Sequence, residues 1–317
     1  MPASDFTPVS AFELPRFAGV PAFMRLPHLG LADPRLGEVD IGIVGVPWDG
    51  GTTNRAGARH GPRALRDAST MIRAQHGVTG LRPFEAVNCA DLGDVPPNPT
   101  NLQDSMARIT TFYETVLSHG IRPLTAGGDH LSSLPILRAV AKDGPLGFIQ
   151  FDSHTDLNDS YFGGEKFTHG TPFRRAVEES LIDPKRMIQI GIRGTAGDFE
   201  DRDFARAVGI RIVTVEELFA RGIPDVMAEA REILGQEPAY LSYDIDFVDP
   251  AFAPGTGTPE VGGPTSFQAL QVVRELAGVT LAAADLVEVS PPFDAGNATA
   301  WLGASLLFEI LCVMAAG

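Results

Sequence analysis

The chain has 317 residues, of which 44% are hydrophobic and 21% are charged. This composition excludes wholesale disorder and predicts one large α/β domain, with two small domains as the alternative. The formal net charge of −15 at pH 7 repels nucleic acid and anionic membranes and favours cationic ligands, so neither is expected as a partner. Acidity also serves solubility, and charge alone selects no substrate.

The cysteines and the chain ends favour a reducing, cytoplasmic location. Cys89 and Cys312 are far apart in apolar surroundings, which is typical of buried thiols rather than of a disulfide framework or a catalytic nucleophile. The first residues carry acids and prolines and lack the basic and apolar regions of a signal peptide. No apolar run is expected to reach membrane-spanning length, because Glu309 interrupts the C-terminal LLFEILCVMAA.

The chain order of predicted elements separates an arm from a body. Residues 1–38 are Pro-rich and irregular, and we expect them to pack on the body or on a neighbouring subunit. Residues 39–317 form one body, without a repeat or a dividing linker. The predicted strands are 41–46, 122–126, 146–151, 187–192, 210–215, 239–243 and 281–289. The predicted helices are 62–76, 101–119, 132–141, 172–180, 223–234, 266–276 and 300–314.

The helix predicted over 101–119 has the clearest pattern. Apolar residues recur at helical spacing between Leu102 and Leu117, Asn101 can cap the start and Gly120 can close the end. Strands that alternate with such helices predict a mostly parallel sheet covered on both faces, which is an α/β fold. Ligands of such sheets bind where the strands end at their carboxyl termini.

Acidic and imidazole side chains follow several of the predicted strands. The run FDSHTD closes 146–151, DID closes 239–243, GGDH follows 122–126, and Glu288 lies near the end of 281–289. A buried carboxylate is costly unless it is paired or bound to a metal. The candidate metal ligands are therefore His130, Asp152, His154, Asp156, Asp244 and Asp246.

Spacing places several of these side chains together. Alternate residues of an extended segment share a side, so Asp152 lies with His154 and Asp244 with Asp246, whereas Asp156 joins only if its loop curls back. Four carboxylates and two imidazoles exceed the needs of one ion and suit two bridged ions about 3.5–4 Å apart. Oxygen and imidazole donors favour Mn²⁺, with Ni²⁺ as the main alternative and cobalt or iron also compatible.

Structural roles are expected for other polar residues. A single Asp after a strand is usually a turn or cap residue, and we assign Asp49 and Asp129 to that role. His28, His60, His76 and His119 have no partners in sequence and are expected in loops or at the surface. The glycines of GTGTPEVGG lack the Lys and Ser/Thr of a P-loop, so they predict a loop that approaches the metals.

The strings GGDH, FDSHTD and SYDIDFVDPAFAPGTGTPEVGG resemble the three metal-binding signatures of the ureohydrolases, the arginase and agmatinase family. Similar strings at 45–66, 169–179 and 287–294 extend the resemblance over nearly the whole body. It implies a single-domain α/β/α sandwich, a dinuclear manganese centre, and hydrolysis of a guanidino group to urea and an amine by a metal-bridging hydroxide. It also implies a homo-oligomer, a trimer or a hexamer, although a hetero-oligomer with a paralogue stays open.

The resemblance assigns roles residue by residue. It implies that Asp152 and Asp244 bridge two ions, that His130 and Asp156 complete one site, and that His154 and Asp246 complete the other. It implies further that Asp156 orients the hydroxide and passes a proton to the leaving amine, that His169 is a proton shuttle, and that Glu288 pairs with the guanidinium. Ser153 stands where relatives often carry alanine, and we expect no ligation and little effect from it.

The chemistry of a guanidinium agrees with these roles. This planar, resonance-stabilised cation needs a strong nucleophile at neutral pH, a carboxylate that holds it flat, and a proton for the leaving nitrogen. Glu288 could supply a bidentate carboxylate, and Asp156 or His169 the proton.

The substrate is the more open question. The segments 15–29, 46–63 and 161–176 resemble the guanidino-acid hydrolases, especially guanidinopropionase. Tyr161 follows the metal loop, and its phenol would shorten the pocket and favour 3-guanidinopropionate over 4-guanidinobutyrate. Asn158, Lys166 and Arg55 are candidate partners for a substrate carboxylate. Guanidinobutyrase, agmatinase and proclavaminate amidinohydrolase activities, and hydrolysis of guanidine or a substituted biguanide, stay open.

Two other classes are compatible with the fold. A non-catalytic subunit that supports an active paralogue would be expected to lose a ligand or Glu288, and all are present. A metal-dependent deacylase on a related fold is disfavoured by the paired motifs and by the HG at 169–170. Urea release from guanidines separates the deacylase from a ureohydrolase.

Overall fold

The computed structural model describes residues 4–317, so the first three residues of the predicted arm lie outside the described residues. Within 4–317 the strands form one sheet in the order β2-β1-β3-β8-β7-β4-β5-β6, and every neighbouring pair is parallel. The strands are β1 (Ile41–Gly45), β2 (Cys89–Asp94), β3 (Arg122–Ala126), β4 (Leu146–Phe151), β5 (Ile182–Ile192), β6 (Arg211–Thr214), β7 (Ala239–Asp244) and β8 (Leu281–Val287).

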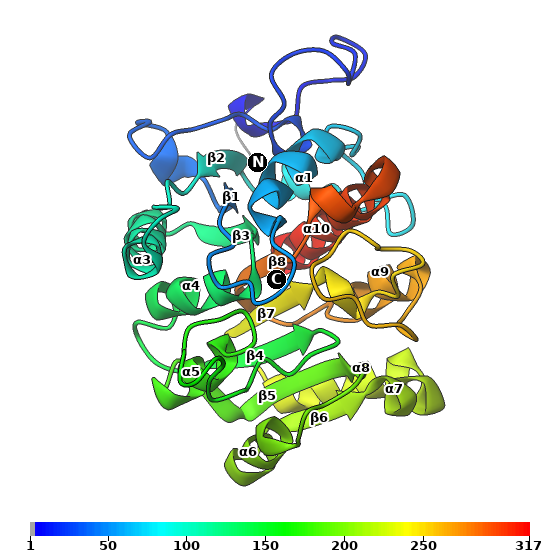
Figure 1. Cartoon of the computed structure of the whole chain (residues 1–317). Coiled ribbons are helices and arrows are strands. Elements are labelled where there is room, and N and C mark those ends of the chain that lie inside the picture. Colours follow the sequence, from blue (N-terminus) through cyan, green and yellow to red (C-terminus); the bar gives the residue numbers. More distant parts are fainter. Residues whose placement is uncertain (1–3) are drawn as a thin grey trace.

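Helices cover both faces of this sheet (Figure 1). Helices α3 to α6 pack on one face, and α1, α8, α9 and α10 pack on the other. Their bounds are α1 (Gly61–Ser69), α2 (Pro83–Ala86), α3 (Leu102–Ser118), α4 (Ser133–Val140), α5 (Pro172–Glu178), α6 (Glu200–Val208), α7 (Val215–Arg221), α8 (Ile223–Leu234), α9 (Ser266–Arg274) and α10 (Ala298–Ala316). The three-layer α/β/α sandwich predicted from the sequence is confirmed.

Side-chain alternation along the strands fills two separate cores. In β5, Ile188 and Ile190 join the core under α8 to α10, whereas Met187 joins the core under α3 to α6. In β4, Ile149 and Phe148 divide in the same way. Both faces of the inner strands are therefore apolar, as a parallel sheet buried between helices requires.

Several predicted boundaries shift, and a few elements were missed. β5 begins five residues before the predicted strand, and helix α1 ends at Ser69 rather than at residue 76. β2 was not predicted because Asp91 and Asp94 interrupt its apolar pattern: the buried Asp91 accepts hydrogen bonds from Phe23 N at 2.9 Å and from Arg66 Nε at 2.8 Å. The predicted strand 210–215 runs into a helix, because the Thr214 side chain caps the start of α7.

The C-terminal helix corrects the expectation about membrane-spanning runs. By length and composition, Ala295–Ala316 is long and apolar enough to cross a membrane, but 72% of its most apolar window is buried inside the body. Glu309 does not break the helix, because Arg274 Nε donates to it at 3.0 Å and His76 Nε2 lies 3.0 Å from it. His76 is thus buried and paired rather than exposed. α10 is a core helix that covers one sheet face.

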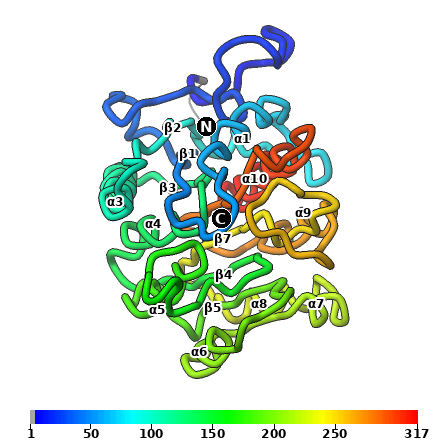
Figure 2. The backbone as a smooth tube through the Cα atoms, viewed as in Figure 1, coloured from blue at the N-terminus to red at the C-terminus, as the bar shows by residue number. Residues whose placement is uncertain are grey.

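The N-terminal segment lies partly on the body and partly away from it. Phe6, Leu29 and Leu36 are buried in the core beneath α3 and α4. Leu29 N donates to the Asp91 carbonyl at 2.9 Å, so the segment runs beside β2 at the sheet edge. Between these anchors the chain loops out at the top of the view (Figure 2), where Phe12 and Phe17 are almost fully exposed.

The sheet order brings four motif-bearing strands side by side. β3, β8, β7 and β4 are consecutive neighbours, although they are far apart in the sequence. Because all four run parallel, their carboxyl ends meet at one edge, where α/β sheets bind ligands. The GGDH, Glu288, DID and FDSHTD segments therefore share one location.

Candidate metal centre

The turns after β4 and β7 orient their carboxylates in the same way. Asp152 uses Oδ1 to accept a hydrogen bond from His154 N at 2.7 Å, and Asp244 uses Oδ1 to accept one from Asp246 N at 2.8 Å. Each turn fixes one oxygen and leaves the other directed at His130, whose Nδ1 is 3.1 Å from Asp152 Oδ2 and 3.2 Å from Asp244 Oδ2. These local hydrogen bonds hold the two carboxylates toward a common point.

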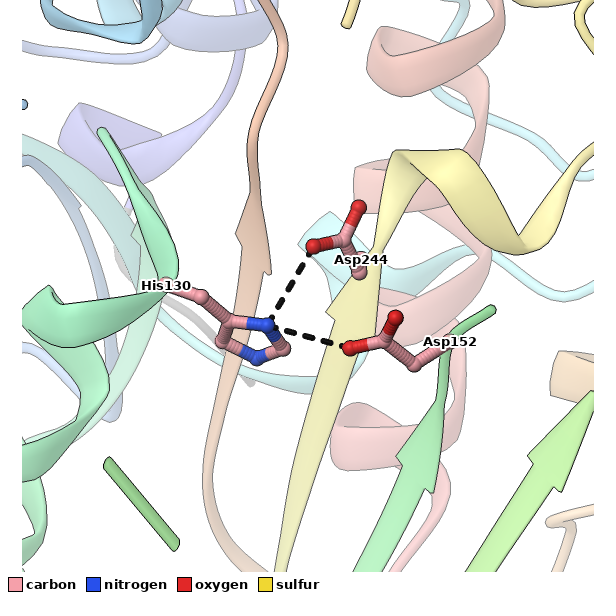
Figure 3. Close-up of side chains that lie close together, drawn as sticks. All are labelled: His130, Asp152 and Asp244. Atoms are coloured by element: carbon pink, nitrogen blue, oxygen red, sulfur yellow. Dashed lines mark ion pairs between the residues drawn. The ribbon is translucent and has the colours of Figure 1, made fainter. Parts of the chain in front are cut away.

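His130 supplies the imidazole at this point. It begins the 3-10 helix η5 (His130–Ser132) after β3, and Figure 3 shows its ring facing Asp152 and Asp244 from a separate element. Asp156 Oδ2 lies 2.9 Å from the same Nδ1 atom. The buried Nδ1 nevertheless has no hydrogen-bond partner of acceptable geometry. One nitrogen faced by three carboxylate oxygens fits a shared cation.

A second ligand group lies beside the first. His154 Nδ1 is 3.0 Å from Asp246 Oδ2, a buried oxygen without a hydrogen-bond partner, and 3.6 Å from Asp152 Oδ1. Ligand atoms within 4.8 Å of one another define two groups in the described chain, and Asp152 belongs to both. Asp244 joins only the first group, so the second bridge implied by the resemblance is not evident in this arrangement. The two groups are His130, Asp152 and Asp244, and Asp152, His154 and Asp246.

The electrostatics of the cluster call for cations. Burial, together with the neighbouring Asp246 and Asp156, raises the pKa of Asp152 to about 7. Burial likewise raises the pKa of Asp244 well above its ordinary value. Burial also opposes ionisation of Asp246, but His154 and the Ser153 hydrogen bonds outweigh it and hold that pKa below its usual range. Several buried carboxylates this close repel one another, and bound cations would remove that cost.

Ser153 is more involved than the sequence suggested. Its hydroxyl donates to Asp246 Oδ1 at 2.7 Å and its backbone N–H donates to the same oxygen at 3.0 Å. Asp246 Oδ2 is thereby left free to face His154. Ser153 does not need to ligate in order to orient a ligand, which is the usual task of groups behind a metal site.

A buried polar network fixes the His130 ring from behind. His130 Nε2 lies 2.8 Å from Ser242 Oγ, which donates to Asp285 Oδ1 at 2.7 Å. Tyr240 and Ser133 both donate to Asp285 Oδ2 at 2.6 Å. Since the Ser242 proton is committed to Asp285, Ser242 accepts from Nε2–H, and the lone pair of His130 is on Nδ1, facing the cluster.

Asp285→Asn is expected to weaken metal binding by about tenfold to a hundredfold, because the amide no longer fixes the Ser242 hydroxyl and the His130 tautomer. Metal titration of the purified variant measures the affinity, and circular dichroism checks the fold. Ser133→Ala is the matched control, since it removes one donor to Asp285 but leaves the Ser242 contact intact. An unchanged affinity in Asp285→Asn would contradict the assignment.

Glu288 and His169 form a pair next to the cluster. Glu288 Oε1 accepts hydrogen bonds from His130 N and from His169 Nδ1, both at 2.9 Å. Thr53 Oγ1 lies 2.8 Å from His169 Nε2 and can accept a hydrogen bond from the protonated ring. Burial opposes the charge on His169, but the Glu288 carboxylate outweighs it and raises the His169 pKa to about 9. These two contacts engage Oε1, and the predicted bidentate pairing of Glu288 with a guanidinium stays a prediction.

Two of these functional residues have a left-handed backbone. Asp156 has φ of 52° and Glu288 has φ of 62°. Non-glycine residues adopt this region at a cost of about 1–3 kcal/mol and persist there when surrounding contacts impose it. The cost is concentrated at residues whose carboxylates must face the cluster.

A cavity of about 350 Å³ opens onto the cluster. Its wall includes the predicted catalytic residues Asp156, His169 and Glu288, together with the predicted substrate-binding residues Asn158 and Tyr161. The Tyr161 hydroxyl accepts a hydrogen bond from Asn158 Nδ2 at 3.0 Å.

Two candidate partners for a substrate carboxylate are corrected by the structure. Arg55 donates to the carbonyls of Gly257 and Thr256 at 2.9 and 2.8 Å, and Lys166 pairs with Asp159 at 3.5 Å. Neither lines the cavity, whereas Arg193 and Arg202 do. Sequence reasoning missed Arg202 because the helix that carries it, α6, is short and five of its nine residues are charged.

An α/β/α sandwich with two His/Asp ligand groups at one sheet edge, under a cavity that holds an imidazole and a carboxylate, defines a metal-dependent hydrolase of the ureohydrolase class. The profile of the arginase family matches residues 39–313. The chain belongs to the arginase family, as its motifs predicted.

Comparisons with individual proteins agree with this assignment. The chain is 55% identical to a guanidinopropionase from Pseudomonas aeruginosa and 49% identical to a guanidinobutyrase from the same organism, each over 97% of this chain and 96% of the relative. Among solved structures, the proclavaminate amidino hydrolase from Streptomyces clavuligerus superposes with a TM-score of 0.90 at 40% identity. That superposition covers 95% of this chain and 99% of the other.

Proposed function

We propose that the chain hydrolyses a short guanidino acid, 3-guanidinopropionate in the first place, to urea and β-alanine. One cavity brings the two metal-ligand groups together with the Glu288 carboxylate and the His169 imidazole. This observation carries the proposal. The similarity of the chain to a guanidinopropionase and a guanidinobutyrase supports guanidino acids as the substrate class.

The donor set supports two divalent cations, which we propose to be Mn²⁺, with Ni²⁺ as the alternative. One would be held by His130, Asp152, Asp156 and Asp244, and the other by Asp152, His154, Asp244 and Asp246. The orphaned Nδ1 of His130 and Oδ2 of Asp246 fit this use, and carboxylate and imidazole donors suit Mn²⁺. When bound, such ions supply a nucleophile at neutral pH.

The chain's own residues would hold the substrate and move protons. Glu288 Oε2 lies at the cavity and accepts no hydrogen bond from residues 4–317, so one carboxylate oxygen is available to the guanidinium. Because the pKa of His169 is raised to about 9, this imidazole is protonated at neutral pH and can donate a proton to the leaving amine. Asp156 lines the same cavity and is the second candidate for that transfer.

Urea release tests this function. The purified chain is loaded separately with Mn²⁺ and Ni²⁺ and offered 3-guanidinopropionate, 4-guanidinobutyrate, agmatine, arginine, guanidine and a biguanide. Preferred turnover of 3-guanidinopropionate is the expected result. No urea from any of these compounds with metal bound would overturn the proposal and favour a non-catalytic subunit that requires a paralogue.

Tyr161→Met is expected to shift the preference from 3-guanidinopropionate toward 4-guanidinobutyrate by about tenfold in kcat/KM, since one or two methylenes typically change binding by this much. The phenol lies at the cavity wall, and Gly170 leaves room for it, because a Cβ there would meet the Tyr161 hydroxyl at 2.5 Å. Tyr161→Phe is the control, because it keeps the ring. An unchanged preference in Tyr161→Met would show that Tyr161 does not set the length.

We further propose a cytoplasmic homo-oligomer, a trimer or a hexamer, in which the arm of residues 1–38 contacts a neighbouring copy. The exposed Phe12, Phe17 and Val20 on the projecting loop support this role. The double variant Phe12→Ser/Phe17→Ser is expected to reduce the mass measured by light scattering. A mass equal to that of the wild type, at all concentrations, would remove the loop from the interface.

A further inference from the structure

The two arginines that line the cavity differ in what they already bind. Arg193 is buried and its guanidinium donates to the carbonyl of Asp246 at 2.7 Å and to that of Glu260 at 2.8 Å. A third donor reaches the Gly191 carbonyl at 3.2 Å. Arg193 therefore supports the backbone beside the ligands and has little capacity left for a substrate.

Arg202 has the opposite character. Within residues 4–317 its guanidinium makes no hydrogen bond and no ion pair, and the contact recorded for it is the ring of Phe199, whose centroid lies 5.0 Å away. The side chain is half-buried at the cavity. A partly desolvated guanidinium without a counter-charge is suited to an anionic group of a ligand.

The base of Arg202 is fixed to the metal loop. Thr155 Oγ1 donates to Asp201 Oδ2 at 2.5 Å, and the Arg202 backbone N–H donates to Asp201 Oδ1 at 2.7 Å. Thr155 is also held through its carbonyl, which accepts from Gln189 Nε2 at 2.6 Å. The start of α6 thus keeps a fixed position relative to the metal-ligand cluster. The distance from the cluster to Arg202 can therefore set where a substrate tail is bound.

The acids at this part of the cavity do not compete strongly with Arg202 for a substrate tail. Both oxygens of Asp201 accept hydrogen bonds from the chain. Asp198 is exposed, and one of its oxygens accepts from Glu200 N at 3.1 Å. An exposed carboxylate contributes little to binding an ammonium group, because water screens the pair. At this end of the cavity, Arg202 is therefore the group that can attract a carboxylate tail.

Building on the proposed function, we propose that Arg202 binds the tail carboxylate of the guanidino acid and so selects acids over amines. A substrate with a cation at one end and an anion at the other would then lie between Glu288 and Arg202, both of which line the cavity. In this arrangement Tyr161 limits the length of the substrate, whereas Arg202 selects the charge of its tail. No covalent step is added to the reaction.

Substrate panels on three variants test this role. Urea release is measured with 3-guanidinopropionate, agmatine and tail-less guanidine for the wild type, Arg202→Gln, Arg202→Lys and Arg206→Gln. Arg206 is the matched control: it lies one turn further on α6, is exposed, pairs with Asp203 at 2.8 Å and does not line the cavity. Calorimetric binding of 3-guanidinopropionate to the metal-loaded proteins provides a readout that does not depend on turnover.

Arg202→Gln is expected to lower kcat/KM for 3-guanidinopropionate by about 10- to 100-fold, mainly through KM, and to weaken its binding by a similar factor. Guanidine and agmatine should change by less than about threefold, and Arg202→Lys should recover part of the loss. Equal losses for all three substrates, or unchanged binding of 3-guanidinopropionate, would overturn the role of Arg202. A wild type that binds 3-guanidinopropionate through Arg202 but releases no urea would instead overturn the proposed function alone.

Discussion

Asp152→Asn is expected to reduce urea release by at least about a thousandfold and to deplete both ions, since loss of a group shared by a metal cluster removes the nucleophile. Asp152 belongs to both ligand groups. Its Oδ2 also accepts a hydrogen bond from Gln150 Nε2 at 2.6 Å, so an amide nitrogen there would face another donor. Metal content per chain and urea release are measured together, with the exposed Asp143→Asn as the control.

The metal-free proteins separate a ligand role from a structural one. Burial and neighbouring carboxylates raise the pKa of Asp152 from its ordinary 3.8 to about 7. In the absence of cations, ionisation of Asp152 therefore costs stability, and this cost grows as the pH rises above about 3.8 and is complete above about 7. With a chelator at pH 8, Asp152→Asn should unfold at a temperature equal to or above that of the wild type. A much lower unfolding temperature would mean that Asp152 mainly stabilises the fold.

The strand-end ligands could be predicted because their signal is local. A carboxylate directly after a buried strand needs a partner, and parallel strands end at the same edge. Asp152 and Asp244 also make their own turns with the next residue but one, so the turn geometry is encoded within three residues. What the sequence did not encode locally was the strand order that inserts β8 between β3 and β7.

The groups behind the ligands were missed because their partners are distant in the chain. Asp285 is a lone acid in an apolar strand, and its role depends on Ser242, 43 positions away, and on Ser133, 152 positions away. Arg202 lies on a short, highly charged helix whose narrow apolar face, Phe204, Ala205 and Val208, did not mark the element in the sequence. Tertiary neighbours, rather than periodicity, define both residues.

The contacts that Glu288 makes within the chain could not be predicted from the sequence, for a backbone reason. From sequence, a left-handed backbone conformation is expected mainly at glycine. Glu288 adopts such a conformation, with φ of 62°, although it is not a glycine. That conformation turns its Oε1 toward His130 N and His169. Neither propensity nor spacing carries this information, because it depends on the contacts that hold the strained residue.

Glu288→Gln is expected to lower kcat/KM for the guanidino substrate by about a hundredfold or more while both ions stay bound. The amide removes the negative charge that faces the cavity, and charge-assisted pairs are roughly twice as strong as neutral ones. Its carbonyl oxygen can still accept the hydrogen bond from His130 N, so the ligand group stays in place. Kinetics and metal content are compared with those of the exposed Glu237→Gln, and loss of metal in Glu288→Gln would contradict the separation of the two roles.

The same substitution should change the titration of His169. Burial lowers the His169 pKa, but Glu288, with Asp156 and Asp129, outweighs burial and raises that pKa from its ordinary 6.5 to about 9. The ion pair therefore stabilises the fold fully below pH 6.5, and this contribution is lost as the pH rises through about 9. Without the Glu288 carboxylate, less negative charge offsets the effect of burial, so the His169 pKa falls. The alkaline limb of the rate profile then moves down by at least about one pH unit. NMR of the His169 ring protons measures that pKa directly. If the titration and the alkaline limb stayed where they are in the wild type, Glu288 would not control the protonation of His169.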